Sequence, residues 1–238
     1  MTSGRFKVLA EWLLVGAFLV VLSIPLWLKV DSLPIRLFDE AQNAVNALEM
    51  SETHNWLVRT YDYQPDTFDC KPPLLIWFQV LSIKALGVSE LSIRLPSVVF
   101  SILSLFVLFL LVFKITDKKW PGLLAALITV TSAGFYGDHA GRFGDHEALL
   151  ILLILVFLYC LYSYSHNPKS NYIYRMGAAI ALGVLCKSVA ILMILPGSVL
   201  YLWFFNHLTG LFTDKHLYYA TFCSLLIIAF YYLGRTYF

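Results

Sequence analysis

The sequence predicts an all-α integral membrane protein, and three observations support this fold class. Of the 238 residues 59% are apolar, only 13% are Asp, Glu, Lys or Arg, and the mean hydropathy is +0.74. A soluble domain carries roughly a quarter charged residues. The apolar residues also gather in long runs. Soluble, disordered, collagen-like and disulfide-scaffold classes therefore fit poorly.

Seven of these apolar runs are predicted to span the membrane, because a spanning helix needs about 20 apolar residues. They cover about 9–30, 91–113, 120–137, 147–164, 176–186, 189–205 and 217–234. The first is too long for a signal peptide and lacks a small-residue cleavage site, so we interpret it as an anchor. The fifth and sixth are short and flank Lys187-Ser188, which predicts a pair of short helices that turn there. One long span is the alternative.

The orientation follows from Lys and Arg in the short loops, which favour the cytoplasmic side. These residues lie at 5–7, 114–119, 169–175 and 215, all on one side if the spans number seven. The first outer loop, about 31–90, holds nine acids against four bases, and the loop 137–147 emerges on the same face. We therefore expect the functional residues on the outer face of the cell membrane, or of the inner membrane in a Gram-negative cell. The whole chain, 1–238, is interpreted as one membrane domain.

Two interfacial helices are predicted inside the first outer loop. Behind Asp39-Glu40, four apolar residues recur at helical spacing and indicate about three turns of amphipathic helix, namely Ala41, Ala44, Val45 and Leu48. Such a helix would place its apolar stripe against lipid or the bundle. Pro72-Pro73 then opens an apolar helix from Leu74 to about Leu86, since proline is tolerated in a first helical turn.

The acidic residues at the ends of these helices allow two interpretations. Asp39 and Asp145 each precede an apolar run, so either can be an N-cap, with Glu40 and Glu147 as first-turn acids. A carboxylate at the membrane surface can instead act as a general base. The loop 137–147 crowds three glycines, three acids, two histidines and an arginine, and such clusters near hydrocarbon mark function. His139, His146 and the acids of this loop can also be metal ligands, although the spacing matches no defined metal site.

The cations of the outer face are candidate phosphate ligands. Arg36, Arg94 and Arg142 can bind phosphate with a planar fork of donors. Lys71 and Lys187 are either snorkelling anchors or fixed charges that oppose an anion. The net charge of +2 gives no indication of a nucleic-acid partner. The four cysteines show no zinc or redox spacing, and an intrachain disulfide is not expected.

An ordered set of short motifs resembles the GT-C membrane glycosyltransferases, which include the protein O-mannosyltransferases and the bacterial lipid A aminoarabinose transferase. The resemblance covers roughly residues 5–200, and its pieces are Phe38-Asp39-Glu40-Ala41, Asn55-Trp56-Leu57-Val58, Lys71-Pro72-Pro73-Leu74, Phe78-Gln79, Leu86-Gly87, Arg94-Leu95-Pro96-Ser97, Arg142-Phe143-Gly144-Asp145 and Leu185-Cys186-Lys187-Ser188. Each piece alone is weak, but their order is specific.

The resemblance implies a polyprenyl-phosphate sugar as donor and an acceptor of unknown identity, with membrane lipid around both. It implies that Asp39, beside Glu40, deprotonates an acceptor hydroxyl, and that Asp145 orients the acceptor or the sugar. The phosphate would be bound by cations, namely Lys71, Arg142, Lys187 and Arg36. It requires no cofactor and leaves room for a divalent cation.

Two departures from the family and two competing functions bear on this interpretation. Family members usually continue well beyond the position of Phe238, so the C-terminal part of the family is expected to be absent here, and Ser188 stands where glycine is usual. A non-catalytic module that binds polyprenyl phosphate or assists a partner is therefore the main alternative to a transferase. A transporter ranks lowest, because no inverted repeat is visible and the polar residues cluster on one face.

Overall fold

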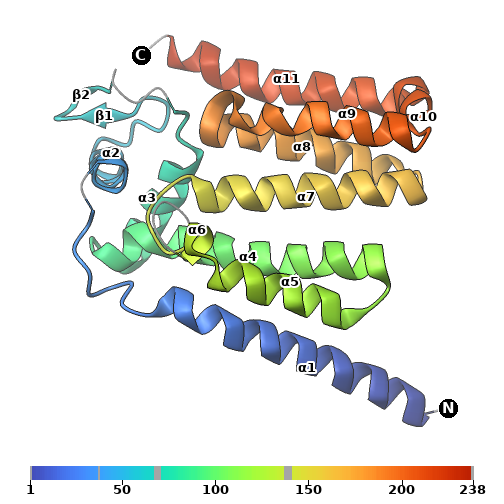
Figure 1. Ribbon diagram of the computed structural model, residues 1–238. Helices are drawn as coiled ribbons and strands as arrows, with labels where there is room; N and C mark the ends of the chain where they lie inside the picture. Colours follow the sequence, from blue (N-terminus) through green and yellow to red (C-terminus); the bar gives the residue numbers. More distant parts are fainter. Residues whose placement is uncertain (1, 37, 67–70, 137–140, 237–238) are drawn as a thin grey trace.

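In the computed structural model, residues 2–36, 38–66, 71–136 and 141–236 are described, with side chains from residue 6 onward. His139 and Cys70 of the sequence analysis lie outside them. The long helices are α1 (Thr2–Trp27), α4 (Glu90–Thr116), α7 (Glu147–His166), α8 (Ser170–Lys187) and α11 (Lys215–Arg235). Figure 1 shows them running along one common direction, with α5 (Lys119–Thr131) and α9 (Ile194–Phe204) beside them.

The remaining elements are short and lie at the ends of this bundle. One end carries α2 (Asp39–Thr53), β1 (Thr60–Tyr61), β2 (Gln64–Pro65), α3 (Leu74–Leu86) and α6 (Ala133–Tyr136). The other end carries α10 (Leu208–Thr213) and the N-terminus. The 3₁₀ helix η1 (Ser188–Met193) connects α8 to α9. The two strands pair antiparallel, Thr60 with Pro65 and Tyr61 with Gln64.

The all-α membrane fold predicted from the sequence is confirmed, whereas the count of seven spans stays a prediction. Among the described residues, five helical stretches are long and apolar enough to cross a membrane, namely Phe6–Trp27, Glu90–Thr116, Glu147–His166, Ser170–Phe204 and Lys215–Arg235. The fourth stretch comprises α8, η1 and α9, and the chain reverses within it. The runs predicted at 120–137 and 189–205 form the shorter α5 with α6, and η1 with α9. The helix predicted at Leu74–Leu86 is confirmed as α3.

The chain reverses at Lys187-Ser188, as predicted, and the alternative of one long span is wrong. A Cβ added to Gly183 would lie 2.5 Å from a side-chain carbon of Ile191, eight residues later. Eight residues of continuous helix rise by about 12 Å, so this contact requires the chain to fold back. Ser188 makes the turn with a left-handed φ of 51°, a conformation that glycine adopts most easily.

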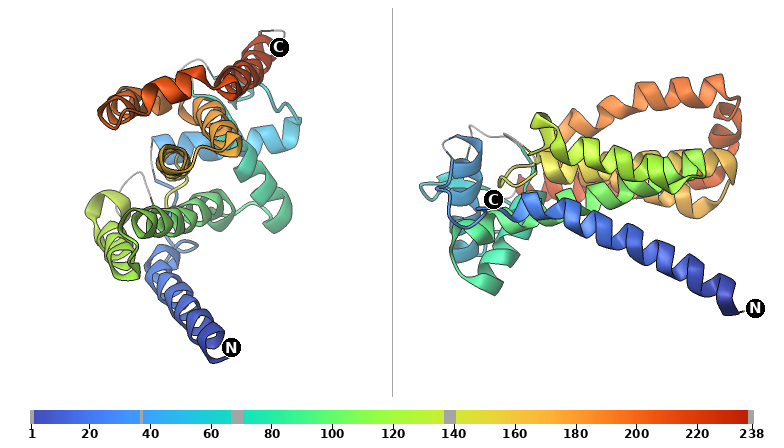
Figure 2. Two further views of the ribbon diagram at one scale, coloured as in Figure 1. Left: turned by 90° about the vertical axis from the view of Figure 1, so that its right-hand side faces the viewer. Right: turned by 60° about the horizontal axis from the view of Figure 1, so that its bottom comes forward.

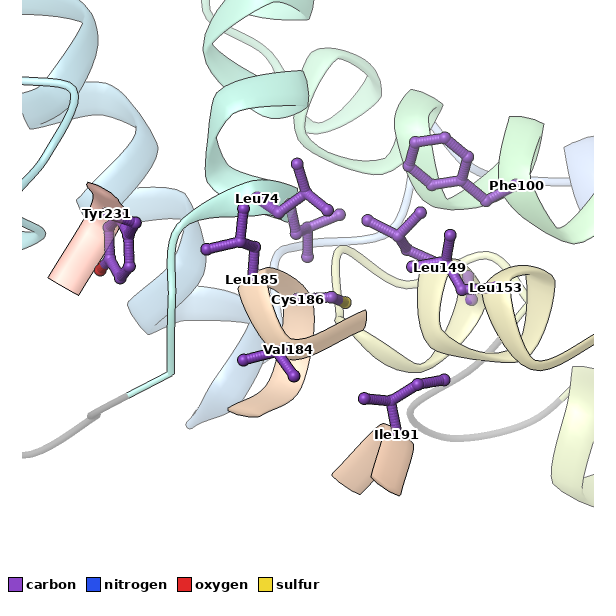
Figure 3. Close-up of a cluster of buried hydrophobic side chains, with 11 residues drawn as sticks. Leu74, Phe100, Leu149, Leu153, Val184, Leu185, Cys186, Ile191 and Tyr231 are labelled. Carbon is purple, nitrogen blue, oxygen red and sulfur yellow. The ribbon is translucent and has the colours of Figure 1, made fainter. Parts of the chain in front are cut away.

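Two of the four buried hydrophobic clusters show how the bundle is packed. Buried side chains of α1, α4 and α5 form one cluster, which includes Leu19, Leu105 and Phe109. The other lies beneath the polar end, where α3, α4, α7, α8, η1 and α11 meet; Figure 3 labels its Leu74, Phe100, Leu149, Leu153, Val184, Leu185, Cys186, Ile191 and Tyr231. Figure 2 shows α1 diverging from the other helices toward the N-terminus, so much of its apolar surface is exposed.

Helix α2 packs differently from the prediction. Its predicted apolar stripe, Ala41, Ala44, Val45 and Leu48, is only partly buried. The buried face consists instead of Glu40, Asn43, Asn46, Ala47, Glu49 and Met50. This face is mostly polar because arginine side chains and backbone groups from other elements supply its hydrogen-bond partners. Figure 1 shows the helix nearly end-on, lying across the end of the bundle.

Candidate active site

Glu40 is the central acceptor of the polar end. Its side chain is buried, and its Oε1 accepts hydrogen bonds from Arg94 Nε at 2.7 Å and from the amide of Gly144 at 2.9 Å. Its Oε2 accepts from the amide of Arg36 at 2.8 Å and from Arg94 Nη2 at 3.0 Å. Burial alone would raise the pKa of this carboxyl, but these donors outweigh it and hold the pKa below the usual range.

Arg94 is the partner of Glu40 and is 1% exposed. Besides the two bonds to Glu40, its guanidinium donates to the backbone carbonyls of Val30, Leu33 and Pro34 at 2.7–2.8 Å. These five bonds use the donor capacity of a guanidinium. The interpretation of Arg94 as a phosphate ligand is therefore wrong: this arginine ties the exit of α1 to the start of α2.

Gly144 connects the two acidic motifs. Its amide donates to Glu40, and its carbonyl accepts from Asn43 Nδ2 at 3.1 Å and from Gln79 Nε2 at 3.3 Å. A Cβ at this position would lie 2.8 Å from Ile93 Cγ2, so a larger residue would push the loop away. Since Glu40 follows Asp39 and Gly144 precedes Asp145, these bonds fix the position of one acidic residue relative to the other.

Asp39 itself is the most accessible acid of the candidate site. It is the first residue of α2, whose N-cap is Phe38, so the interpretation of Asp39 as an N-cap is wrong. Its Oδ1 lies 3.5 Å from Lys71 Nζ, and the two side chains are 45% and 23% exposed. The structure thus brings together two predicted site residues that are far apart in sequence, a carboxylate and a lysine reachable from outside.

Asp145 is buried, in contrast to Asp39. Its Oδ1 accepts from the amide of His146 at 2.7 Å and lies 3.4 Å from the ring Nδ1 of that residue. Burial raises the pKa of Asp145, but the two His146 interactions outweigh this effect and hold the pKa well below its usual range. The N-cap of α7 is His146, so Asp145 does not occupy the capping position either.

Lys187 and Glu147 form a second ion pair beside Asp145. The Nζ of Lys187 contacts Oε1 of Glu147, and the two side chains are 30% and 27% exposed. Lys187 is the last residue of α8, before the reversal, while Glu147 opens α7. The anion that lies opposite Lys187 is therefore the carboxylate of Glu147, within the protein itself. The sequence analysis had interpreted Glu147 as a first-turn acid.

The other two predicted phosphate ligands gather around the ring of Phe143. The guanidinium carbon of Arg36 lies 3.9 Å from the ring centroid, and that of Arg142 lies 5.6 Å from it. Arg142 also donates to the carbonyl of Leu28 at 3.0 Å and to the hydroxyl of Tyr136 at 3.2 Å. Because Phe143 is buried while Arg36 is exposed, the ring serves as a platform for these guanidinium groups.

Arg59 is a structural residue of this end that sequence reasoning missed. It is 4% exposed and donates to Asn46 Oδ1 at 2.6 Å, to Asn43 Oδ1 at 3.1 Å and to the carbonyl of Lys71 at 3.1 Å. It therefore holds the backbone at Lys71 against α2. A buried arginine that bonds asparagines from another segment leaves no local sequence signal.

No metal site is found in the described part of the chain, where no three His, Cys, Asp or Glu side chains are grouped as ligands. The predicted site residues Asp39, Glu40, Asp145, Lys71, Arg142, Lys187 and Arg36 all lie on segments at the polar end of the bundle (Figure 1). The basic loops around Lys118, Lys169 and Lys215 lie at the opposite end. The predicted segregation of acidic and basic loops is therefore present in the fold.

The sequence matches the family model described as dolichyl-phosphate-mannose-protein mannosyltransferase over residues 70–232, well over half of the chain. The chain belongs to this mannosyltransferase family. The resemblance to GT-C glycosyltransferases is thereby confirmed, and this family member is a multi-pass membrane protein. No curated protein matches the sequence.

Two solved structures share the fold of this family member. The crystal structure of ArnT from Cupriavidus metallidurans bound to undecaprenyl phosphate superposes with a TM-score of 0.76 at 20% identity, covering 95% of this chain and 41% of that one. The apo structure of the same protein gives a TM-score of 0.70 at 19% identity, with 96% and 42% covered. The chain thus spans about two fifths of the length of the structures it matches.

Proposed function

We propose that this family member transfers a sugar from a polyprenyl-phosphate donor to an acceptor hydroxyl, with Asp39 as the general base. The observation that carries the proposal is the Asp39–Lys71 pair, a partly exposed carboxylate 3.5 Å from an ammonium group. It lies at the polar end of a fold shared with an undecaprenyl-phosphate-bound protein. That lipid supports a polyprenyl phosphate as the donor's carrier here.

In the proposed reaction, Asp39 accepts the proton of the acceptor hydroxyl. The hydroxyl oxygen forms a bond to the anomeric carbon while the bond from that carbon to the phosphate oxygen breaks. The polyprenyl phosphate leaves with the electron pair, and the developing negative charge is stabilised by a fixed cation. The contact of its ammonium with Asp39 supports Lys71 for that role. No covalent bond forms between the sugar and the protein, and Asp39 loses the accepted proton to solvent before the next turnover.

The remaining predicted residues receive supporting roles in this proposal. Arg36 and Arg142, held at the Phe143 ring, offer planar donors to the phosphate. Lys187, already paired with Glu147, is a weaker candidate for direct phosphate binding. Glu40 has no free acceptor position beyond its four hydrogen bonds, so we assign it the positioning of Asp39 rather than a step in the chemistry. Asp145 would orient the acceptor or the sugar.

The decisive experiment measures release of free polyprenyl phosphate from a labelled polyprenyl-phosphate sugar by the purified full chain. Release that depends on an added hydroxyl acceptor supports the transferase. Binding of undecaprenyl phosphate without any release of it from the donor would support the non-catalytic module instead. A protein that neither binds nor releases the lipid would contradict both.

We propose that the polar end faces outward across the cell membrane, the inner membrane in a Gram-negative cell. Single cysteines in place of the exposed Glu52 and, at the opposite end, Lys118 test this in a variant with Cys70 and Cys223 replaced by serine. A membrane-impermeant thiol reagent on intact cells should label Glu52→Cys alone. Labelling of Lys118→Cys alone would reverse the topology and put the proposed site on the cytoplasmic side.

A further inference from the structure

His146 has an unusual position for a histidine in this fold. Its ring is fully buried at the start of α7, between the acids Asp145 and Glu147. Buried polar groups are nearly always hydrogen-bonded, and each exception calls for an explanation. The mechanism proposed above makes no use of this ring.

One ring nitrogen of His146 is accounted for by Asp145. Nδ1 lies 3.4 Å from Asp145 Oδ1, the same oxygen that accepts from the His146 amide at 2.7 Å. Since a carboxylate only accepts, this contact assigns the ring proton to Nδ1. The imidazole and its own amide therefore hold the same carboxylate oxygen from two directions, which fixes the rotation of the Asp145 side chain.

The other ring nitrogen has no hydrogen-bond partner among the residues that the structure describes. Nε2 of His146 is buried and makes no hydrogen bond within the described residues. Burial lowers the pKa of the ring, the charges of Arg59 and Lys71 lower it further, and Asp145 opposes them only in part. A neutral ring protonated at Nδ1 leaves Nε2 as a lone-pair acceptor. An unsatisfied buried acceptor is unfavourable, so a hydrogen bond from an O–H donor would stabilise this nitrogen.

We propose that His146 is a positioning residue of this site: its Nδ1–H orients Asp145, and its Nε2 accepts a hydrogen bond from a hydroxyl group, either of a bound water or of the sugar. This inference rests on the proposed transferase function for its effect on catalysis, but the state of the ring can be measured without it. The two ring nitrogens also allow the two roles to be separated by substitution.

The first test is spectroscopic. The ¹⁵N-histidine spectrum of the full chain, minus that of His146→Asn, isolates the His146 signals among those of six histidines. We expect a neutral ring with the proton on Nδ1 at neutral pH. A charged ring, or a proton on Nε2, would overturn the proposal whether or not the protein proves to be a transferase.

The second test compares His146→Asn, His146→Gln and His146→Phe. The asparagine amide can replace Nδ1, the glutamine amide can replace Nε2, and phenylalanine replaces neither. A misplaced reacting group costs about 100-fold, so His146→Phe should lower kcat by about that factor, with KM for the donor changed less. His146→Asn should recover most of kcat. His146→Gln should instead recover mainly KM if the hydroxyl belongs to the sugar, and neither parameter if it belongs to water.

Control measurements separate the possible failures. Thermal unfolding of the three variants in detergent shows whether the protein remains folded. If kcat falls in proportion to the folded fraction, and His146→Asn is no better than His146→Phe, the residue is only structural and the inference is wrong. A wild-type chain without transfer would refute the proposed function, whereas the spectroscopic result would still decide the role of the ring.

Discussion

Glu40 and Arg94 form an ion pair whose side chains are 4% and 1% exposed. Asp39, the residue before Glu40, pairs with Lys71, and these two side chains are 45% and 23% exposed. In the first pair the carboxylate accepts four hydrogen bonds and the guanidinium donates five. In the second the Nζ–Oδ1 separation is 3.5 Å. The two neighbouring acids therefore differ in burial and in the number of hydrogen bonds that hold them.

The difference shows how a reactive carboxylate can be positioned on a surface. An exposed side chain such as Asp39 cannot be held by its own packing, so its placement must come from the backbone. Glu40 provides this by accepting hydrogen bonds from the backbone amides of Arg36 and Gly144. The saturated pair fixes the scaffold, and the partly exposed pair is the one that we propose contacts the substrate.

The largest expected effect is on activity, from the exposed pair. Asp39→Asn keeps the shape of the side chain but removes the base, and general base catalysis contributes about 10²–10⁴-fold. We therefore expect kcat for polyprenyl phosphate release to fall by about that factor, with thermal stability unchanged. Asp62→Asn, at an exposed acid of the same outer loop, is the matched control. Near-normal release by Asp39→Asn would remove its assignment as base.

The buried pair should instead govern stability. Arg94→Ala leaves the Glu40 charge buried without its main partner, which typically costs about 3–5 kcal/mol. The free energy of unfolding, measured by denaturant titration in detergent, should fall by this amount. Glu11→Gln breaks the exposed Glu11–Lys119 pair and should leave the unfolding curve close to that of the wild type. Equal effects of the two variants would contradict the contrast drawn between buried and exposed pairs.

Lys71 should matter for binding more than for folding. Its side chain is 23% exposed, and a hydrogen bond to a charged group is worth about 1.5–3 kcal/mol. Lys71→Ala should therefore weaken binding of undecaprenyl phosphate by about 10- to 100-fold. Lys84→Ala, at a lysine that lies over the Trp56 ring of the same loop, should bind as the wild type does. Unchanged affinity in both variants would rule out Lys71 as a phosphate ligand.

Gly144, whose amide connects the two acidic motifs through Glu40, can be replaced without changing any charge. In Gly144→Ala the new Cβ meets Ile93 Cγ2 at 2.8 Å and Gln79 Nε2 at 3.1 Å, and such overpacking costs about 1–3 kcal/mol. Both stability and kcat should fall, because the loop that carries Asp145 must move. Gly134→Ala, where a Cβ meets no atom within 4 Å, is the control. If kcat of Gly144→Ala stayed normal, the spacing of the motifs would be irrelevant.

The smallest expected effect is a pH dependence of stability. The pKa of Glu40 is lowered in the folded protein. The ionised Glu40 therefore contributes its full amount to the free energy of unfolding at pH values above the ordinary pKa of a glutamate. This contribution is lost progressively as the pH falls below that value toward the folded pKa. Unfolding midpoints across the acidic range should show this slope, and Glu40→Gln should reduce it. A slope that persists undiminished in Glu40→Gln must arise from other carboxylates.

Much of the fold could be predicted because its signals are local. Apolar runs located α4, α7 and α11 to within three residues, whereas α1 and α8 begin several residues before the runs that predicted them. Proline followed by an apolar run located α3. The reversal at Lys187 was visible as a charge between two short runs. The polar buried face of α2 could not be predicted, because hydrophobic periodicity cannot reveal a face whose partners are arginines and carbonyls from other segments.

By itself, the sequence determined the membrane class, the acidic end, the motif order and the identity of Asp39 and Lys71 as candidates. Only the tertiary structure decided which acids are buried and which remain accessible. Glu40 meets Arg94 across 54 positions and Gly144 across 104, and no local pattern encodes such a separation. The ionic environment of a side chain is set by the groups that folding brings around it, so neighbouring residues such as Asp39 and Glu40 come to have different roles.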